Sequence, residues 1–330
     1  MKAIVQDRYG SADVLEFRDV ETPVPGAGEV LVRVHASSVN ARDWHLMRGD
    51  PYLARLTLGV RRPKAQILGT DFAGRVEAVG AGVTRLRPGD EVFGEAEGAF
   101  AEYMCASEDV VERRPANLSF EQAAAIPLAG TTALMGLRNA GGVRQGQKVL
   151  INGASGGVGT FAVQIAKALG ADVTGVCSTR NVELIRSLGA DRVVDYTQED
   201  FAAGAERYDL LFDLVGNRSL AECRRVLTPA GTLVLSGGGV FEGGSLVGPM
   251  GLLLKGKAMS FLVRQRLLVL SASPGREKLA ALRDLAESGS VTPVIDRTYP
   301  LSEAAEAIRY VEVEHARAKV VVSSPPPSGP

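Results

Sequence analysis

The sequence predicts an α/β protein of two domains, one rich in antiparallel strands and one built on a doubly wound parallel sheet. Three observations support this fold class. The chain has 330 residues, more than one compact core usually serves. Its start consists of short strand-like segments, whereas strand-like and helix-like segments alternate beyond Gln147. From Val294 the pattern of the start returns, so we expect the C-terminus to complete the first domain.

Short strands separated by turns account for the first part of the chain. The candidate strands cover residues 3–5, 29–36, 75–79 and 91–93. The segment 29–36 (EVLVRVHA) alternates apolar and polar residues, which is typical of a strand with one buried face. Turns such as GAGV and RPGD separate these segments. Because no regular helices intervene, the pattern predicts a compact antiparallel sheet.

The pattern changes near Pro115. Ser119 is a candidate N-cap and is followed by helix-forming residues. Beyond Gln147 the expected strands are KVLING, ADVTGVCS, DRVVDY, YDLLFDLVG and GTLVLSGGG, and the expected helices are VGTFAVQIAKALG, NVELIRSLG and SLAECRRVL. Consecutive units of this kind form a parallel, doubly wound sheet. A last strand is expected at 258–263 (AMSFLV) and a helix at 274–288.

These patterns give the expected domain boundaries. The first part of the strand-rich domain covers residues 1–122, and a nucleotide-binding domain covers 123–264. Residues 265–322, read as helix, strand, helix and strand, complete the first domain. The last residues, 323–330 (SSPPPSGP), are expected to form a flexible tail.

Composition narrows the classes of partner and location. Hydrophobic residues make up 45% of the chain and charged residues 23%, with a net charge of −1. This balance is ordinary for a globular protein and gives no electrostatic reason to expect nucleic acid or an anionic membrane as a partner. The sequence shows no secretory signal and no long apolar run, so a cytoplasmic location is expected by default.

Soft metal ligands are scarce. The chain holds three cysteines and three histidines, all widely spaced: Cys105, Cys177, Cys223, His35, His45 and His315. A structural zinc site usually takes four such ligands at short spacings, and an odd number of distant cysteines argues against a disulfide framework. We therefore expect no metal site and a reducing compartment.

The most specific motif is the segment KVLINGASGGVGTFAVQIAKALG. A hydrophobic strand runs into a loop of small residues and then directly into a long helix. Small residues let the backbone approach a pyrophosphate, and the helix N-terminus supplies free N–H groups and a positive dipole. The sequence therefore predicts dinucleotide binding at Gly153, Ser155, Gly156, Gly157 and Val158.

The end of the next strand indicates which dinucleotide is bound. An NAD site usually places Asp or Glu there to bind the ribose 2′-hydroxyl. This chain has Ser178, Thr179 and Arg180 instead, and the next carboxylate along the chain is Glu183. A hydroxyl and a guanidinium suit a 2′-phosphate. We therefore expect NADPH, held by Ser178 and Arg180; the alternative is that Arg180 is a solvated residue at a helix start.

Several motifs together carry a family resemblance. The residues from Gly146 to Lys167 resemble the glycine-rich signature of quinone oxidoreductases and ζ-crystallin-like proteins. GADRVVDYT (189–197), GTDFAGRVEAVG (69–80) and RPGDEVFG (87–94) also look like landmarks of this branch of the medium-chain dehydrogenase/reductase family. The resemblance covers nearly the whole chain. It implies a β-rich GroES-like catalytic domain and a Rossmann-type domain that binds NADPH.

The resemblance also implies catalysis without a metal. Zinc alcohol dehydrogenases of the same family hold their metal with Cys, His and a carboxylate. At the corresponding places this chain has the segments 39–43 (VNARD) and 70–71 (TD), and it lacks the four-cysteine lobe that holds their structural zinc. Hydrogen bonds would then have to stabilise the oxyanion charge that develops on the substrate.

Three residues between positions 40 and 52 are expected to take part in catalysis. Related reductases read V-N-P at the cofactor face, which matches Asn40, although Ala41 replaces the proline. They often carry a Tyr in a later G-x-Y turn, and Tyr52 stands one residue beyond that position. His45 lies on the same segment, and an imidazole there could protonate a substrate near neutral pH. Tyr52, His45 or water would donate the proton; alternatively, His45 and Trp44 pack the loop.

The resemblance places further residues beside the cofactor. Thr132, in GTTAL, matches a family Thr, and Tyr196, in the DYT motif, would flank the 2′-phosphate. Strand ends near the switch point of such a sheet are where cofactors lie. The other expected cofactor contacts, at strand ends or near the closing strand, are Val215, Ser236, Gly237, Phe261, Val263 and Lys319.

The sequence thus favours reduction of a small molecule, a quinone or an α,β-unsaturated carbonyl, by NADPH. Enoyl-thioester reduction is a second enzymatic interpretation, because the segment 53–64 (LARLTLGVRRPK) mixes aliphatic and basic residues and could cover the substrate or bind an anionic substrate tail. A non-catalytic NADPH-binding protein of the same fold is the alternative from another class. The family also implies a homodimer that pairs through an edge strand, expected at 258–263.

Overall fold

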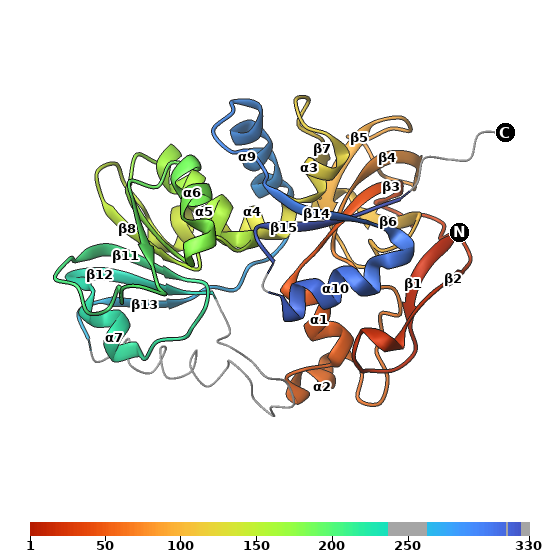
Figure 1. Cartoon of the computed structure of the whole chain (residues 1–330). Coiled ribbons are helices and arrows are strands. Elements are labelled where there is room, and N and C mark those ends of the chain that lie inside the picture. The colour runs from red at the N-terminus through yellow and green to blue at the C-terminus, as the bar shows by residue number, and fades with distance from the viewer. Residues whose placement is uncertain (237–262, 315, 325–330) are drawn as a thin grey trace. The chain divides into compact units, whose positions relative to one another are not determined.

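The computed structural model describes residues 1–236, 263–314 and 316–324, which belong to two compact units (Figure 1). The terminal unit comprises Met1–Thr131, Ser273–Gly289 and Pro293–Pro330, and the central unit comprises Thr132–Ala272 and Ser290–Thr292. The divisions thus fall at residues 131 and 272, where the sequence placed them at 122 and 264. One reason is that helix α4 (Pro127–Leu134) continues across the first division.

Strands from both ends of the chain form the sheet of the terminal unit. Its order is β14-β15-β3-β4-β5-β7, and β6 also pairs with β3. These strands are β3 (Glu29–Val39), β4 (Asp71–Val79), β5 (Glu91–Glu95), β6 (Tyr103–Ser107), β7 (Val111–Arg113), β14 (Ile295–Pro300) and β15 (Lys319–Ser323). β15 pairs antiparallel with β3, so that Val320 lies opposite Val39. A separate hairpin consists of β1 (Lys2–Gln6) and β2 (Leu15–Asp19).

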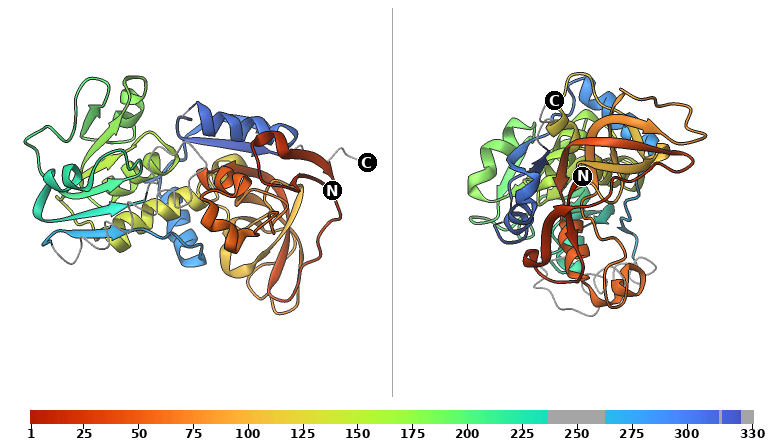
Figure 2. Two further views of the ribbon diagram at one scale, coloured as in Figure 1. Left: turned by 90° about the horizontal axis from the view of Figure 1, so that it is seen from below. Right: turned by 90° about the vertical axis from the view of Figure 1, so that its right-hand side faces the viewer.

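Helices and short turns complete the terminal unit. They are η1 (Ala12–Val14), α1 (Ala41–Arg48), η2 (Tyr52–Ala54), α2 (Arg55–Leu58), η3 (Glu108–Val110), α3 (Phe120–Ala124), α9 (Arg276–Glu287), η6 (Leu301–Glu303) and α10 (Ala304–Val313). Ser119 caps α3 in a capping box with Gln122, as its sequence position indicated. Figure 2 shows α10, in blue, beside the red start of the chain, where Ala307 and Ile308 share an apolar cluster with Ile4 and Ala12.

The central unit contains a parallel sheet. Its described strands are β8 (Lys148–Asn152), β9 (Asp172–Cys177), β10 (Arg192–Asp195), β11 (Tyr208–Asp213), β12 (Leu227–Leu235) and β13 (Arg266–Val269). They are ordered β10-β9-β8-β11-β12-β13 and are all parallel. From β8 the chain adds β9 and β10 on one side, and it then returns to add β11, β12 and β13 on the other side. This is the doubly wound arrangement, and the switch point between β8 and β11 is where such sheets bind dinucleotides.

Helices cover both faces of this sheet (Figure 1). They are the π-helical segment η4 (Met135–Gly141), α5 (Gly157–Ala168), η5 (Thr179–Asn181), α6 (Val182–Ser187) and α7 (Leu220–Arg225). α5 and α6 lie on one face and α7 on the other. The core under α7 joins Leu220 and Cys223 to strand residues such as Leu150 and Leu233.

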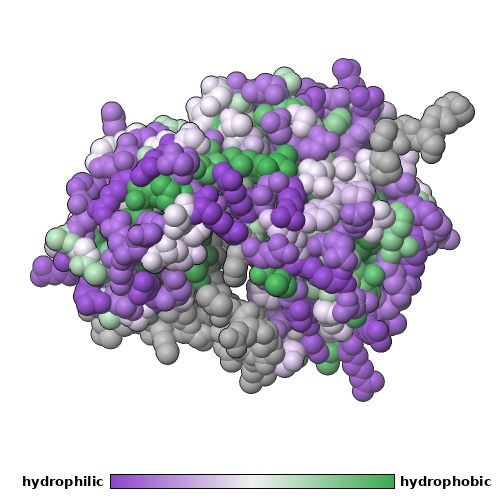
Figure 3. Space-filling model, in the orientation of Figure 1, coloured by the Kyte–Doolittle hydropathy of each residue, from purple (hydrophilic) through white to green (hydrophobic). Residues whose placement is uncertain are grey.

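Two expectations concern the end of the chain. The last strand of the described parallel sheet is β13 (266–269); of the expected edge strand at 258–263, residues 258–262 lie outside the described residues and Val263 precedes β13. The expected tail begins too early, because Ser323 ends β15 and the Ser324 amide still donates to the His35 carbonyl at 3.0 Å. Residues 325–330 lie outside the described residues. On the face drawn in Figure 3, hydrophobic residues form scattered groups among hydrophilic ones.

Candidate functional site

The glycine-rich loop leaves β8 with a geometry that requires glycine. Gly153 has a φ of +88°, and a Cβ there would lie 2.7 Å from Cγ2 of Val215. A Cβ on Gly159 would lie 2.2 Å from the Gly153 carbonyl oxygen. Real Cβ atoms do not approach backbone so closely, so the loop and the first turn of α5 pack together only without these side chains.

The N-terminus of α5 suits an anion. Its N-cap is Gly156, which has no side chain with which to cap the first turn. The Thr160 amide makes the first helical hydrogen bond, to the Gly156 carbonyl at 3.0 Å, so the preceding N–H groups of the turn have no helical acceptor. Among the described residues, the atom nearest to a Cβ at Gly156 would be the Gly153 carbonyl oxygen, 3.6 Å away. A diphosphate therefore fits this cradle, which Gly153, Gly156, Gly157 and Val158 form.

Hydroxyl groups gather between this loop and the end of β9. The buried Asn181 donates through Nδ2 to Ser155 Oγ at 3.0 Å and to Ser178 Oγ at 3.3 Å. Arg180 is exposed on the turn η5, which follows β9. Tyr196 follows the neighbouring strand β10 and is 61% exposed, and its amide donates to the Cys177 carbonyl at 3.0 Å. The ends of β9 and β10 thus bring Ser155, Ser178, Arg180 and Tyr196 to one edge of the sheet.

The structure also brings to this edge a carboxylate that the sequence analysis did not expect there. Asp195 lies opposite Cys177 because β10 pairs with β9. Its Oδ2 accepts from Thr179 Oγ1 at 2.6 Å, and its Oδ1 accepts from the amide and hydroxyl of Thr197 at 3.0 and 2.8 Å. These hydrogen bonds hold the pKa of Asp195 below its usual value. The carboxylate is therefore charged, and local donors already occupy both of its oxygens.

A second polar group at the switch point was missed by the sequence analysis. The buried Asp213 ends β11, and its Oδ1 accepts from the amides of Val215 and Gly216 at 3.1 and 2.9 Å. Asn152, at the end of β8, donates to the same oxygen at 2.9 Å. The Ser236 amide donates to the Asp213 carbonyl at 2.9 Å. The sequence does contain a signal for this group: Asn152 and Asp213 are polar residues that each end an apolar, strand-like segment.

Four expected cofactor contacts of the central unit remain: Thr132, Gly237, Phe261 and Val263. Thr132 is buried in α4. Val263 is half-buried, packs against the core under α7 and precedes β13. In a parallel sheet that position lies at the amino ends of the strands, opposite the edge that binds dinucleotides. Gly237 and Phe261 lie outside the described residues.

A cluster of buried polar groups lies in the terminal unit, where β15, β3 and β4 run side by side. Lys319, 2% exposed, donates to Asn40 Oδ1 at 2.5 Å and lies 3.4 Å from Asp71 Oδ2. Asp71 also accepts from Ser38 Oγ at 2.8 Å and from the Leu128 amide at 2.9 Å. The cation and the carboxylate compensate each other in an interior that would tolerate neither charge alone.

Asn40 lies at the centre of this cluster. Its Oδ1 faces Lys319, and its Nδ2 donates to Asp71 Oδ2 at 3.0 Å and to the Ser38 carbonyl at 3.3 Å. An ammonium only donates and a carboxylate only accepts, so these two neighbours fix the orientation of the amide. Both sides of the Asn40 amide are thus bound within the protein. The structure brings Asn40 and Lys319 together, two residues that the sequence analysis considered separately.

Two further carboxyls surround the cluster. Asp43 accepts from the Asn40 amide at 2.7 Å and from Thr70 Oγ1 at 3.2 Å. Glu95 lies opposite Asp71 across β4 and β5, with Arg42 3.6 Å away. Burial, with a contribution from the charge of Asp71, raises the pKa of Asp43 to about 7 and that of Glu95 to about 7. These two carboxyls therefore titrate near neutral pH.

The other two expected catalytic residues follow in the chain. His45 Nδ1 lies 3.1 Å from the Asp50 carbonyl, and its ring stacks on Trp44. Since a carbonyl only accepts, Nδ1 carries the proton and Nε2 of the neutral ring has none. Burial lowers the pKa of His45, which favours this neutral form. Tyr52 is 44% exposed, with the Arg55 guanidinium 4.7 Å from its ring centroid.

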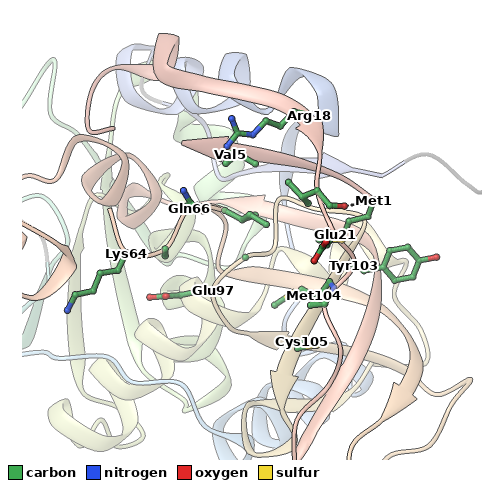
Figure 4. Close-up of a pocket in the computed structure, with 15 residues that line it drawn as sticks. Met1, Val5, Arg18, Glu21, Lys64, Gln66, Glu97, Tyr103, Met104 and Cys105 are labelled. Carbon is green, nitrogen blue, oxygen red and sulfur yellow. Dashed lines mark hydrogen bonds between the residues drawn. The ribbon is translucent and has the colours of Figure 1, made fainter. Parts of the chain in front are cut away.

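A cavity of about 420 Å³ in the terminal unit contains none of the expected site residues. Figure 4 shows its lining, which comes from the hairpin β1–β2, the segment 64–67 and β6. Its polar groups are partly engaged: Arg18 and Gln66 both donate to the Asp7 carboxylate, at 3.0 and 3.1 Å. We therefore do not assign the cofactor or the substrate to this cavity.

The described residues offer neither a metal site nor a membrane-spanning helix. Residues 1–236, 263–314 and 316–324 contain no group of three or more His, Cys, Asp or Glu side chains placed to hold a metal ion. Within the same residues, every helix is too short or too polar to cross a bilayer.

Known proteins resemble this chain along nearly its full length. Residues 26–116 match the alcohol dehydrogenase GroES-like domain, and residues 188–322 match a family described as zinc-binding dehydrogenase. A mitochondrial NAD(P)H oxidoreductase of Mus musculus is 36% identical over 98% of this chain and 89% of its own length. The chloroplastic NADPH-dependent alkenal/one oxidoreductase of Arabidopsis thaliana is 32% identical over 98% and 79%.

A solved structure gives the same result. The quinone oxidoreductase from Coxiella burnetii superposes with a TM-score of 0.85, at 33% identity, over 98% of this chain and 99% of its own. The two-unit fold and these relatives define an NAD(P)H-dependent oxidoreductase. The chain belongs to the medium-chain dehydrogenase/reductase family.

The relatives contradict the expected cytoplasmic location. The Mus musculus and Arabidopsis thaliana relatives described above are named as mitochondrial and chloroplastic proteins, which conflicts with that default. The physical reason is that organelle addresses are carried on segments that are removed from the mature protein. The composition of a folded domain therefore does not identify its compartment.

Proposed function

We propose that this oxidoreductase uses NADPH and reduces quinones or α,β-unsaturated carbonyls without a metal. The observation that carries the proposal is the edge formed by the glycine-rich loop and the ends of β9 and β10. There, a helix N-terminus with glycine as its N-cap stands beside two serines and an exposed arginine. Such groups favour a diphosphate at one place and a second phosphate nearby.

The preference for NADPH over NADH rests on the donors at this edge. Ser178 and Arg180 supply a hydroxyl and a cation, as a 2′-phosphate requires. Asp195 is the carboxylate that could instead accept from a ribose hydroxyl. Its oxygens already accept three hydrogen bonds from Thr179 and Thr197, so it has little capacity left for a ribose.

Bound NADPH would supply a hydride to the electrophilic carbon of the substrate. In the central unit, Asp213 holds the amides of Val215 and Gly216, which orders the end of β11 beside the switch point. In the terminal unit, Lys319 and Asp71 hold Asn40, which orders the chain where it enters α1. These residues act as positioning residues, because their polar atoms contact other protein groups.

The reduced oxygen of the substrate must also receive a proton. We favour the Tyr52 hydroxyl or water for this step. His45 is a poorer donor, because its Nδ1 proton is directed to the Asp50 carbonyl and burial disfavours a second proton on the ring. The substrate class is suggested by the relatives, one named as an alkenal/one oxidoreductase and one as a quinone oxidoreductase.

NADPH oxidation with a panel of quinones, alkenals and enoyl thioesters tests the proposal. Turnover of quinones or alkenals with NADPH, at a much higher kcat/KM than with NADH, is the expected result. Preferred turnover of enoyl thioesters would replace the substrate class. Tight NADPH binding without turnover of any compound would instead make the chain a non-catalytic binding protein.

Replacement of Arg180 tests the choice of cofactor. Arg180→Ala should weaken NADPH binding about 10- to 100-fold, as expected for a lost charge-assisted hydrogen bond, and leave NADH binding nearly unchanged. Arg186→Ala, which removes an exposed arginine on the next helix, is the matched control. The two dissociation constants are measured by titration calorimetry. An equal effect of Arg180→Ala on both dinucleotides would refute the phosphate assignment.

A further inference from the structure

One short stretch of the terminal unit has a charge very different from that of the whole chain. Residues 51–70 contain four cations and no acidic residue, although the net charge of the chain is −1. One of these cations, Arg55, is engaged within the protein: it donates to the carbonyls of Gly49 and Arg48 at 2.9 and 3.0 Å. The other three, Arg61, Arg62 and Lys64, are exposed.

The same stretch exposes aliphatic side chains. Leu56 is 70% exposed, Val60 66% and Leu53 43%. Leu53 lies in η2, directly before α2. Leu56 follows three residues later, within α2, and Val60 follows four residues after that. Single exposed aliphatic residues are ordinary, but three in eight residues, followed at once by three cations, form an amphipathic surface. We name residues 53–64 the basic apolar loop.

The basic apolar loop has a fixed base. The Arg55 guanidinium lies over the rings of Tyr9 and Tyr52, 4.6 and 4.7 Å from their centroids. The Tyr9 hydroxyl donates to the Gly59 carbonyl at 2.7 Å, and the Lys64 amide donates to the Leu58 carbonyl at 2.8 Å. The exposed aliphatic side chains therefore project from an ordered platform, so a partner need not order the loop on binding.

The neighbouring carboxylates leave these cations available. Asp7 is close enough for Arg62 to lower its pKa, but its main partner is Arg18, which donates to both of its oxygens at 3.0 Å. Glu97 lines the same cavity as Lys64 and lies 3.6 Å from Arg42. The positive charge of the loop is thus not cancelled by the acidic groups beside it.

We propose that the basic apolar loop docks the protein on a bilayer that carries anionic lipids. Leu53, Leu56 and Val60 would enter the boundary between head groups and acyl chains, while Arg61, Arg62 and Lys64 contact lipid phosphates. Charge complementarity selects this occupant, because three exposed aliphatic residues are followed within four residues by three exposed cations, a combination that suits an anionic interface. The docking goes beyond the proposed reductase function and does not depend on it.

Flotation of the full chain with vesicles tests the proposal. Vesicles of phosphatidylcholine with phosphatidylglycerol should carry the protein upward at low ionic strength, and vesicles of phosphatidylcholine alone should carry much less. Raising the salt concentration should weaken binding, since the cations act over about a Debye length. Inorganic phosphate at matched ionic strength should not release the protein, which distinguishes a bilayer from a free phosphate ligand.

Substitutions identify the surface. Each cation near an anionic bilayer contributes about fivefold, so Arg61→Gln with Arg62→Gln and Lys64→Gln should lower the partition coefficient about 100-fold. Leu56→Ser with Val60→Ser should lower it about tenfold or more. A matched control removes exposed charge and exposed aliphatic surface elsewhere, with Arg276→Gln and Val313→Ser. The control should bind as the unchanged protein does.

Three results would overturn the proposal. The unchanged protein could fail to float with anionic vesicles, the loop variants could float as well as the unchanged protein, or the control could lose binding equally. A loop variant that instead alters the oligomeric state in size-exclusion chromatography, with no change in flotation, would assign the loop to a second copy of the chain. Reduction of a water-soluble quinone by the loop variants is measured in parallel, and it separates failure of docking from failure of the proposed reductase function.

Discussion

At the residue scale, Lys319 and Asp71 are the charged pair that the interior of the terminal unit depends on. Both are almost completely buried, and Asn40 and Ser38 add hydrogen bonds to the same oxygen of Asp71. A buried ion pair is not by itself proof of added stability, because desolvation offsets the attraction. Removal of one partner is a different case, since it leaves an uncompensated charge behind.

Lys319→Met should therefore lower the free energy of unfolding by about 3–5 kcal/mol. Urea denaturation followed by circular dichroism measures it. The double variant Lys319→Met with Asp71→Asn should be less destabilised than the sum of the two single changes, because no charge is left buried. Strict additivity, or an unchanged midpoint for Lys319→Met, would show that the pair is not coupled.

A substitution at Gly156 tests cofactor binding independently of folding stability. Its Cβ would meet no atom closer than 3.6 Å, and its φ of −79° suits any residue. Gly156→Ala should thus change the free energy of unfolding by less than about 1 kcal/mol. It should weaken NADPH binding about tenfold or more, because the methyl group occupies space that the diphosphate must enter.

Gly159→Ala is the contrasting variant, since its Cβ would lie 2.2 Å from the Gly153 carbonyl oxygen. It should lose both stability and binding. Titration calorimetry and thermal denaturation measure the two effects. If Gly156→Ala bound NADPH as tightly as the unchanged protein, the diphosphate would not lie at this turn.

At the scale of elements, helix α1 begins at a capping box that contains a titratable carboxyl, that of Asp43. Asn40 is its N-cap, and Asp43 completes a capping box with it while buried beside Thr70. A carboxylate at a helix N-terminus is normally favourable. Here burial outweighs that benefit and raises the pKa of Asp43 to about 7, and Glu95 behaves in the same way across β4 and β5.

The protein should therefore be more stable at pH 5 than at pH 8. A carboxyl whose pKa is higher in the folded state binds more protons when folded, so the free energy of unfolding falls as pH rises from about 4 to about 7. Each group contributes on the order of 3 kcal/mol over this range. Asp43→Asn, which keeps an acceptor at the cap, should flatten the dependence measured by urea midpoints between pH 5 and pH 8. An unaltered slope would exclude Asp43 as its source.

Local patterns in the sequence predicted most elements. The capped start of α3 and the alternation from β8 to β12 follow from signals within a few residues. The strand, the glycine-rich loop and the helix after it were predicted together, because their signals lie in one continuous segment. Boundaries were less accurate: β4 begins at Asp71 and not at residue 75, which places that carboxylate inside the sheet beside Ser38.

The parts of the site that were missed depend on contacts between distant segments. Asp195 reaches the end of β9 through strand pairing, and Lys319 reaches Asn40 because β15 returns to β3. The spacing of residues along the chain predicts neither of these two contacts. The strand β13 at 266–269 was not expected for another reason: apolar runs lie on both sides of Val263, and periodicity alone does not choose between them. The expected strand at 258–263 lies, apart from Val263, outside the described residues.

At the scale of the whole molecule, β13 is the last strand of the described parallel sheet. The Leu270 amide donates to the Leu235 carbonyl at 2.8 Å, so the alternate amide, that of Val269, faces the outer edge. Edge strands with free amides readily pair with another chain. We propose that this edge forms the homodimer that the family resemblance implied.

Val269→Pro should convert a dimer to a monomer without unfolding it, because proline removes an outward amide and leaves the pairing with β12 intact. Light scattering coupled to size-exclusion chromatography measures the mass. Leu270→Pro removes the inward amide instead and should destabilise the central unit. A dimer that persists in Val269→Pro would place the interface elsewhere.

The terminal unit is assembled from both ends of the chain, and this affects how it folds during synthesis on the ribosome. Asp71 and Lys319 are separated by 248 residues, and β15 is the final strand to be translated. At about 5–20 residues per second, the nascent chain carries Asp71 without its counter-ion for roughly 12–50 seconds. The central unit ends at Thr292 and is complete before β15 is translated, so it is expected to fold first, while the first 131 residues remain a client for chaperones until the last strand emerges.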